Sequence, residues 1–289
     1  VADQLETLGV SSRIKVIKTT GDKMGARALS KLVATSGVKG VFTKELEIAL
    51  ENGEIDLAVH SLKDVPTVLP EGFIIPSVLV RAPVADVIIT KSKGGLDALP
   101  EGATVATSSV RRQKMLRWLR PDIKLVDIRG NVPTRLRKLA ENGELDGIIL
   151  AQAGLKRLGY DPEGEMSTEA GSVYGALLDP ETFLPAAGQG AVGIEVREGD
   201  DAVINAVKEI CHAETFTRVT AEREFLRLLD GGCHTPVGVA SNLLGDSLLM
   251  EAIVFPEGDE LGQPLRAEIS GSANEPVETA GILFSSLSV

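Results

Sequence analysis

Residues 104–151, TVATSSVRRQKMLRWLRPDIKLVDIRGNVPTRLRKLAENGELDGIILA, decide the fold class of this chain. Three short apolar runs predict strands, and the two segments between them predict helices. The predicted strands are 104–106, 123–128 and 147–151, and the predicted helices are 110–119 and 132–140. Ser109 and Asn131 suit the starts of the two helices, and Pro121 ends the first of them. Strands that alternate with helices predict a parallel sheet covered by helices.

The helix–turn–strand pattern occurs a second time, nearer the N-terminus. The motif Glu-Asn-Gly-Glu-Xaa-Asp stands at 51–56 and again at 141–146. Each copy follows a predicted helix, at 42–50 or 132–140, and each precedes an apolar run that is typical of a buried parallel strand. The shared context predicts two similar α/β halves.

The C-terminal third has a different pattern. One helix is predicted over 214–229, ended by Gly231 and Gly232. Strands joined by turns are then predicted at 237–240, 248–255 and 265–269. This order indicates a small α+β domain. The polar stretch 161–172 is predicted to be a surface loop.

Charge is distributed unevenly along the chain. The net charge is −11, but residues 111–138 hold ten basic and two acidic residues and so carry +8, which leaves −19 elsewhere. A solvated helix face is the common explanation of such a run. An acidic protein with one basic segment also suits a small polyanion, whereas a general nucleic-acid binder is usually basic overall.

Several classes of protein are not indicated. No apolar run approaches the ~20 residues that span a bilayer, so no membrane partner is expected. The first residues show no signal-peptide pattern. Two cysteines in 289 residues favour a reducing compartment over a disulfide framework.

One cluster of candidate functional residues follows the apolar run at 57–59. His60, Lys63 and Asp64 come where a strand is predicted to end, and ligands of open α/β sheets bind beyond that end of the strands. Two interpretations stay open for Asp64: a functional carboxylate, or a simple ion pair with Lys63.

A second cluster lies at the two strand ends within 104–151. Arg111 and Arg112 stand in the first turns of a predicted helix, where the helix dipole disfavours positive charge. A bound carboxylate or phosphate explains them better than a solvated face, and the hydroxyls before them suit the same ligand. Arg129 and Arg135 occupy the corresponding positions one strand later, so two anion sites are predicted to line one crevice. Neither segment has a phosphate-loop pattern.

Cys233 follows the Gly-Gly pair, where the backbone can come close to a ligand. The alternatives are a small buried side chain, or a nucleophile beside His234. Cys211 is interpreted as structural. No Cys-Xaa-Xaa-Cys or His pair is present, so no metal is expected.

Taken together, the chain resembles the porphobilinogen deaminase (hydroxymethylbilane synthase) family. The segments that carry the resemblance are 41–47, 58–66, 107–113, 129–132, 153–159, 184–191 and 231–233. The resemblance implies two domains like the halves of periplasmic binding proteins with a cleft between them, and a small α+β domain. The implied boundaries are 1–82 with 190–210, then 83–189, then 211–289, and the chain begins inside the family's first helix.

The resemblance also implies the reaction. Four porphobilinogen molecules are joined head to tail, with release of ammonia, on a dipyrromethane cofactor held by a cysteine thioether. The growing chain bears acetate and propionate groups, which accounts for a basic segment in an acidic protein. A carboxylate beside the pyrrole nitrogens stabilises positive charge there and moves protons.

Residue roles follow from the resemblance position by position. Asp64 is the implied catalytic residue and Cys233 the implied attachment site. The implied cofactor-binding residues are Ser61, Lys63, Thr107, Ser109, Arg111, Arg112, Asn131 and Gln189, and the implied substrate-binding residues are Lys39, Arg129, Arg135 and Arg157. The expected partners are porphobilinogen and its oligomers, with no nucleic acid, in a monomeric and cytoplasmic enzyme, or a plastid one if a transit peptide has been removed.

Two other functions are compatible with parts of the pattern. A solute-binding protein for a dicarboxylate would use the same two lobes without chemistry and without a covalent group on Cys233. An RNA-binding module would use residues 111–138 and would need exposed aromatic side chains for stacking, but only Trp118 lies there.

Overall fold

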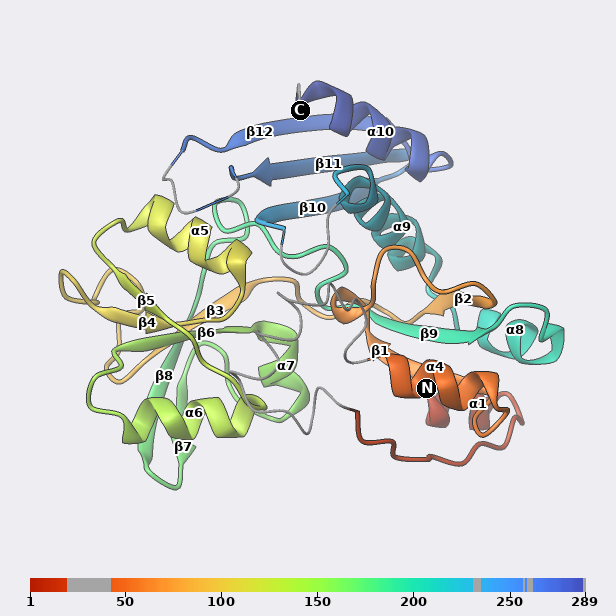
Figure 1. Cartoon of the computed structure of the whole chain (residues 1–289), viewed down its shortest axis with the longest axis horizontal. Helices are drawn as coiled ribbons and strands as arrows, with labels where there is room; N and C mark the ends of the chain where they lie inside the picture. Colours follow the sequence, from red (N-terminus) through yellow and green to blue (C-terminus); the bar gives the residue numbers. More distant parts are fainter. Residues whose placement is uncertain (20–42, 231–234, 257, 259–261, 288–289) are drawn as a thin grey trace.

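The computed structural model describes residues 1–19, 43–230, 235–256, 258 and 262–287. Its strands form three sheets, and Figure 1 shows them as two α/β lobes side by side with a third domain lying against both. Within these ranges no helix is both long and apolar enough to cross a membrane. The predicted architecture of two α/β lobes and a small α+β domain is confirmed.

In the described residues, the first lobe is built around a sheet of three strands. It contains α1 (Ala2–Thr7), α4 (Lys44–Glu51), β1 (Leu57–Ser61), the 3-10 helix η1 (Leu62–Asp64), β2 (Phe73–Val78), β9 (Val192–Arg197) and α8 (Asp201–Lys208). The sheet order is β1-β9-β2. Ile194 and Val196 of β9 pack against Ile204 and Val207 of α8 in a fully or almost fully buried core.

The strand after the first repeat differs from its prediction. β1 is antiparallel to β9, with Leu57 opposite Val196 and Ser61 opposite Val192, and not a parallel strand in the pairs described. It is also not buried throughout, because Val59 is 48% exposed. The physical reason is non-local: β9 comes from more than a hundred residues further along the chain and inserts between β1 and β2, which no local apolar pattern reports.

The second lobe holds a larger mixed sheet. It contains β3 (Asp86–Thr90), β4 (Thr104–Ala106), α5 (Val110–Leu119), β5 (Lys124–Val126), α6 (Val132–Glu141), β6 (Gly147–Ala151), α7 (Gln152–Arg157), β7 (Glu165–Thr168) and β8 (Gly171–Leu177). The order is β5-β4-β6-β3-β8-β7. β5, β4 and β6 are parallel as predicted, while β3, β8 and β7 are added antiparallel.

The predictions for this lobe hold with two differences. The strand predicted over 123–128 is confined to β5. The surface loop predicted over 161–172 is wrong, because β7 and the start of β8 form a hairpin there. In each strand one apolar residue, Met166 or Val173, is buried in the core, while the residues beside it are more exposed. The hairpin can therefore attach to the core although its composition is mostly polar.

The third domain agrees with the sequence pattern. It contains α9 (Ala213–Leu228), β10 (Val237–Leu244), β11 (Ser247–Val254), β12 (Leu265–Ser272) and α10 (Pro276–Ser286). The three strands form an antiparallel meander, and Phe225, Met250 and Leu283 are among the residues buried between sheet and helices. The predicted Gly-Gly helix end and Cys233 lie outside the described residues.

Two chain segments connect the lobes and run side by side. The Ala82 amide donates to the Gly190 carbonyl at 2.9 Å. Gly190 has φ +82°, and a Cβ there would lie 2.4 Å from the Ala82 oxygen, so this close approach requires glycine. Helix α9 is joined to the same place, because Glu222 accepts two hydrogen bonds from Arg81, at 2.6 and 2.8 Å, and one from the Gly188 amide at 2.8 Å.

Candidate active site

The turn after β1 brings a carboxylate and a lysine to the junction of the lobes. Leu62 buries its side chain, and its amide donates to the Ala191 carbonyl at 3.0 Å, which fixes the start of η1. Asp64, the last residue of η1, is exposed. Lys63 is half-buried, and its Nζ donates to Gln189 Oε1 at 3.3 Å. His60 does not join them as the sequence suggested, because its Nε2 lies 2.8 Å from Glu195 Oε2 in a buried pair on β1 and β9.

Across from this turn, two buried arginines share one buried carboxylate. Arg111 and Arg112 each direct an Nη2 to an oxygen of Asp86 at 2.7 Å, and Gln189 Nε2 donates to the same carboxylate at 3.0 Å. Asp86, the first residue of β3, has no exposed surface. The sequence predicted that a carboxylate accounts for the two arginines at the helix start. Asp86, a residue of this chain, supplies the first such carboxylate.

The charge of this cluster is not balanced. Two guanidinium groups face one carboxylate, and the Nε atoms of Arg111 and Arg112 are buried without a hydrogen-bond partner among the described residues. Burial opposes the ionisation of Asp86, but the positive charges of the two arginines and their hydrogen bonds outweigh it and hold the pKa of this carboxyl well below its usual range. The excess positive charge suits a ligand with several carboxylates.

The excess positive charge of the second lobe also affects the pKa of Lys63 in the first lobe. Burial first, and then the positive charge of Arg112, lowers the pKa of Lys63 to about 8, while Asp64 and Asp86 act in the opposite direction. The Lys63 ammonium is thus held in a basic environment where only part of the charge is compensated. Such a group gains most from an anionic ligand.

The second strand end adds Arg129 and Arg135. Asn131 caps α6, accepting from the Thr134 amide at 3.0 Å, and Arg135 Nε donates to the Gly130 carbonyl at 2.6 Å. Burial lowers the pKa of Arg135, the charges of Arg112 and Arg129 lower it further, and Asp64 raises it. Arg135 therefore lies within electrostatic reach of both the basic cluster and the carboxylate of the other lobe.

The remaining candidates have varied surroundings. Thr107 is buried, and its Oγ1 accepts from the amide of Ser109, the half-buried N-cap residue of α5. Ser61 ends β1 and is half-buried, and Arg157 is exposed at the end of α7. Lys39 and Cys233 lie outside the described residues. No group of three or more His, Cys, Asp or Glu side chains that could hold a metal occurs in the part of the chain that is described.

Residues that the sequence did not single out complete the arrangement. Asp86 is the lone acid in the apolar segment 84–89, which is a signal for a buried ion pair. Glu222 and Arg223 lie in the middle of α9 with buried neighbours, and they bind residues of the first lobe and of the two segments that connect the lobes, here called the crossovers. Nothing in the local sequence indicates partners more than a hundred positions away.

Fold and side chains define a two-lobed α/β protein with a third domain and with unbalanced basic groups where the lobes meet. The chain belongs to the porphobilinogen deaminase family. A family model described as "Porphobilinogen deaminase, dipyromethane cofactor binding domain" matches residues 1–205, and one described as "Porphobilinogen deaminase, C-terminal domain" matches residues 216–283.

Relatives and solved structures with similar chains are known. Porphobilinogen deaminase of Pelotomaculum thermopropionicum is 44% identical over 95% of this chain and 83% of that protein, and that of Moorella thermoacetica is 45% identical over 94% and 82%. Among solved structures, the periplasmic VFT2 domain of Bordetella pertussis BvgS has 21% identity and a TM-score of 0.35, covering 64% of this chain and 75% of that one. A substrate-binding protein of an amino acid ABC transporter has 15% identity and a TM-score of 0.35, covering 79% and 80%.

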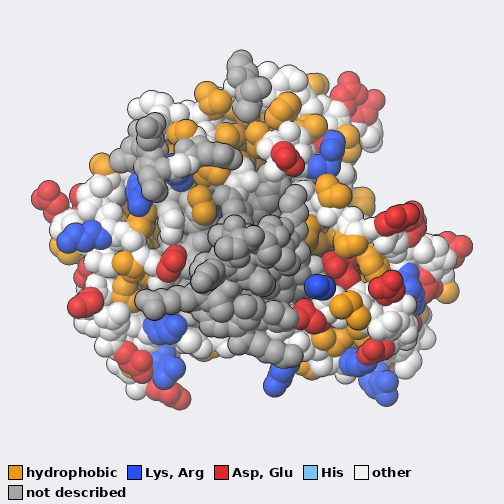
Figure 2. Space-filling model, viewed as in Figure 1, with side chains coloured by type: hydrophobic (Ala, Val, Ile, Leu, Met, Phe, Trp, Pro, Cys, Tyr) orange, Lys and Arg blue, Asp and Glu red, His pale blue; other side chains and the backbone are white. Residues whose placement is uncertain are grey.

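The family settles the class of reaction that the sequence predicted. The chain is a tetrapyrrole-forming transferase that acts on porphobilinogen with a dipyrromethane cofactor, and the solute-binding alternative is set aside. On the described part of the face in Figure 2, acidic and basic side chains are interspersed around both lobes.

Proposed function

We propose that the reaction takes place where the Lys63–Asp64 turn of the first lobe faces Arg111, Arg112 and Arg135 of the second. One observation carries this proposal: two lobes contribute basic groups whose positive charge the single buried carboxylate of Asp86 does not balance. A substrate that brings an acetate and a propionate, and a product that accumulates them, would supply the missing negative charge.

The dipyrromethane group fits these residues. Its carboxylates would meet Lys63, Arg111 and Arg112. The Nε atoms of the two arginines are buried without a hydrogen-bond partner among the described residues, and burial lowers the pKa of Lys63 and of Arg111. Cys233 would hold it through a thioether, and the remaining proposed contacts are Ser61, Thr107, Ser109, Asn131 and Gln189. When bound, the group supplies the free α-carbon of a terminal pyrrole as nucleophile.

The residues of the chain would do the rest. Asp64 would accept a hydrogen bond from the pyrrole N–H and stabilise the positive charge that the ring gains when the substrate's protonated aminomethyl group leaves as ammonia. After the new carbon–carbon bond has formed, the carboxylate would take up the proton that the attacking α-carbon loses. Arg129, Arg135, Arg157 and Lys39 would hold the carboxylates of incoming substrate and of the growing chain. Exposure of Asp64 at the end of η1 supports a carboxylate that meets a ligand and not an internal ion pair.

Domain limits, assembly and location form part of the proposal. The sheets occupy 57–78 with 192–197, 86–177 and 237–272, which supports domains of 1–82 with 190–210, 83–189 and 211–289. We propose a monomer, because the described site residues of both lobes come from one chain. The low cysteine count supports the cytoplasm as its location.

The attachment site can be tested by the intact mass of the denatured full-length protein. We expect a dipyrrole adduct in the wild type, its loss in Cys233→Ser, and its retention in the control Cys211→Ser, since Cys211 is half-buried and lies before α9. An adduct that survives Cys233→Ser, or an active enzyme without any adduct, would contradict the proposal.

The role of Asp64 can be tested with two variants. Asp64→Asn keeps the size of the side chain and removes the charge, so we expect normal folding and cofactor content with turnover lowered roughly 10²–10⁴-fold. Asp64→Glu should keep more activity than Asn, because the charge survives. A simple ion pair with Lys63 predicts the opposite result, a lower melting temperature with near-normal turnover.

A further inference from the structure

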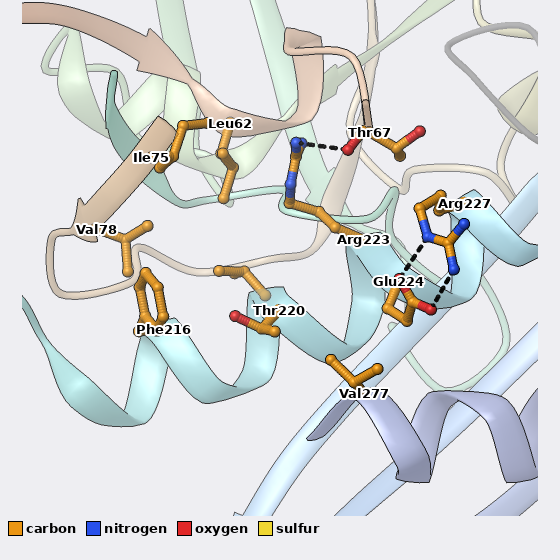
Figure 3. A pocket seen from close by; sticks show the side chains of 11 residues that line it. Leu62, Thr67, Ile75, Val78, Phe216, Thr220, Arg223, Glu224, Arg227 and Val277 are labelled. Carbon is orange, nitrogen blue, oxygen red and sulfur yellow. Dashed lines mark hydrogen bonds and ion pairs between the residues drawn. The ribbon is translucent and has the colours of Figure 1, made fainter. Parts of the chain in front are cut away.

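We infer that Arg223 is a positioning residue, which holds the Asp64 turn in place from the third domain. The inference rests on the proposed role of Asp64. Arg223 projects from α9, and its guanidinium donates to the Val65 carbonyl at 3.1 Å and to the Pro66 carbonyl at 2.7 Å, with the Thr67 oxygen at 3.5 Å. Figure 3 shows the guanidinium reaching from the helix to the chain segment at Thr67.

The turn has few hydrogen bonds within itself among the described residues. Helix η1 has only three residues, and a single backbone hydrogen bond of 3.2 Å, from the Val65 amide to the Leu62 carbonyl, closes its end. The carbonyls that follow have no place in a helix or strand, so they need an external donor. A guanidinium with several donors in a fixed plane meets two of them at once.

Packing does not replace those hydrogen bonds. A cavity of about 200 Å³ lies between the turn and α9. Leu62, Ile75 and Phe216 are among its lining side chains, and Figure 3 shows them on one side of the space that the Arg223 stem crosses. Leu62 of η1 packs against Val219 and Phe216 of α9, but residues 63–67 are not part of that apolar cluster, so packing anchors the start of the turn and not the chain after it. The Arg223 hydrogen bonds therefore join the chain after Asp64 to α9.

Neighbouring residues of α9 hold different parts of the site. Glu222 binds Arg81 and the Gly188 amide at the crossovers, and Arg223 binds the turn one residue after Asp64. Helix α9 is thereby hydrogen-bonded both to the crossovers and to the Asp64 turn, and it fixes the position of the turn relative to the crossovers. Arg223 donates to backbone oxygens and not to the Asp64 carboxylate, so it acts on the position of that carboxylate.

The experiment uses the full-length holoenzyme and the variants Arg223→Met, Arg223→Lys and Arg227→Met. Rates of single porphobilinogen additions are followed by rapid quench and intact mass, together with KM, cofactor content and melting temperature. Arg227 is the matched control, because it lines the same cavity but binds Glu224 of its own helix through two hydrogen bonds of 2.7 Å.

We expect Arg223→Met to slow each addition about 10–100-fold, since a shift of about 1 Å in a catalytic group can cost on the order of 10²-fold. KM and cofactor content should be close to wild type. Arg223→Lys should recover part of the rate because an ammonium can reach one of the carbonyls, and Arg227→Met should match the wild type. Amide exchange should quicken at 62–67 and stay unchanged in the middle of α9.

The double variant Asp64→Asn/Arg223→Met separates positioning from a general structural role. If Arg223 acts through Asp64, its loss should slow the residual rate of Asp64→Asn less than twofold. A loss of equal size in both backgrounds, or an Arg223→Met enzyme with the wild-type rate, overturns the inference while the role of Asp64 stands. A wild-type rate in Asp64→Asn instead overturns the proposed function, and the inference falls with it.

Discussion

Replacing Asp86 by Asn should destabilise the second lobe more than any comparable change of a surface acid. Asp86 has no exposed surface, and both of its oxygens lie 2.7 Å from guanidinium groups that are at most 7% exposed. Asn has one acceptor oxygen and no charge, so two buried cations lose their only buried counterion among the described residues. Removing one partner of a buried ion pair costs about 3–5 kcal/mol, and we expect a loss of unfolding free energy of that size.

The assay is urea unfolding followed by tryptophan fluorescence. The chain has one tryptophan, Trp118, which lies on α5 with Arg111 and Arg112 and therefore reports on the helix that Asp86 holds. Asp122→Asn is the control, because Asp122 also binds an arginine through two contacts of 2.8 Å but lies at the surface. Equal losses of unfolding free energy in the two variants would refute the argument that burial makes the Asp86 ion pairs more stabilising than a surface pair.

The same comparison has a pH dependence of known sign. The folded-state pKa of Asp86 is lowered, so its stabilisation is present above the unfolded value of about 3.9 and is lost as pH falls below that value towards the folded pKa. The difference between wild type and Asp86→Asn should therefore be largest near neutral pH and shrink in acid. A difference that grew on acidification would contradict the assigned charge state.

Three further outcomes are expected. Cofactor assembly by cofactor-free protein should slow as pH rises through about 8, the pKa of Lys63, and Lys63→Gln should remove this dependence. Gly190→Ala should destabilise the protein more than Gly199→Ala when melting temperatures are compared, since both have positive φ but only the first meets a backbone oxygen at 2.4 Å. Arg135→Leu should stall chain growth in a single-turnover mass assay, whereas Arg137→Leu, which loses only an exposed contact with Glu141, should not.

The sequence predicts those parts of the fold that short-range patterns determine. The helices α5 and α6, the strands β4 and β6 and the cap at Asn131 follow from periodicity and helix-start residues within a few positions of one another. The pairing of β1 with β9 depends on contacts across more than a hundred residues, and local apolar content is the same for parallel and antiparallel partners. The β7–β8 hairpin was not predicted because only one residue of each strand is buried, so the composition of the segment is mostly polar.

For the site, residue types were more predictable than residue partners. Two arginines at a helix start indicated a carboxylate, but not that Asp86, some 25 positions earlier, supplies the first one. The family resemblance assigned roles to motif residues, and those roles stay predictions for Lys39 and Cys233, which lie outside the described residues. The role of Arg223 could not be predicted because the residue binds backbone carbonyls, which every residue type has and which no sequence motif indicates.

The central position of β9 in the first sheet has a consequence for synthesis of the chain. β1 and β2 leave the ribosome early, but the strand that lies between them begins at Val192, 114 residues after β2 ends at Val78. At about 5–20 residues per second, roughly 6–23 s pass before it emerges. During that interval the strands of the second lobe, 86–177, can already pair, while β1 and β2 wait with open edges that invite wrong partners. β1 and β2 should therefore be a source of chaperone demand during translation, because their sheet cannot be completed until β9 is made.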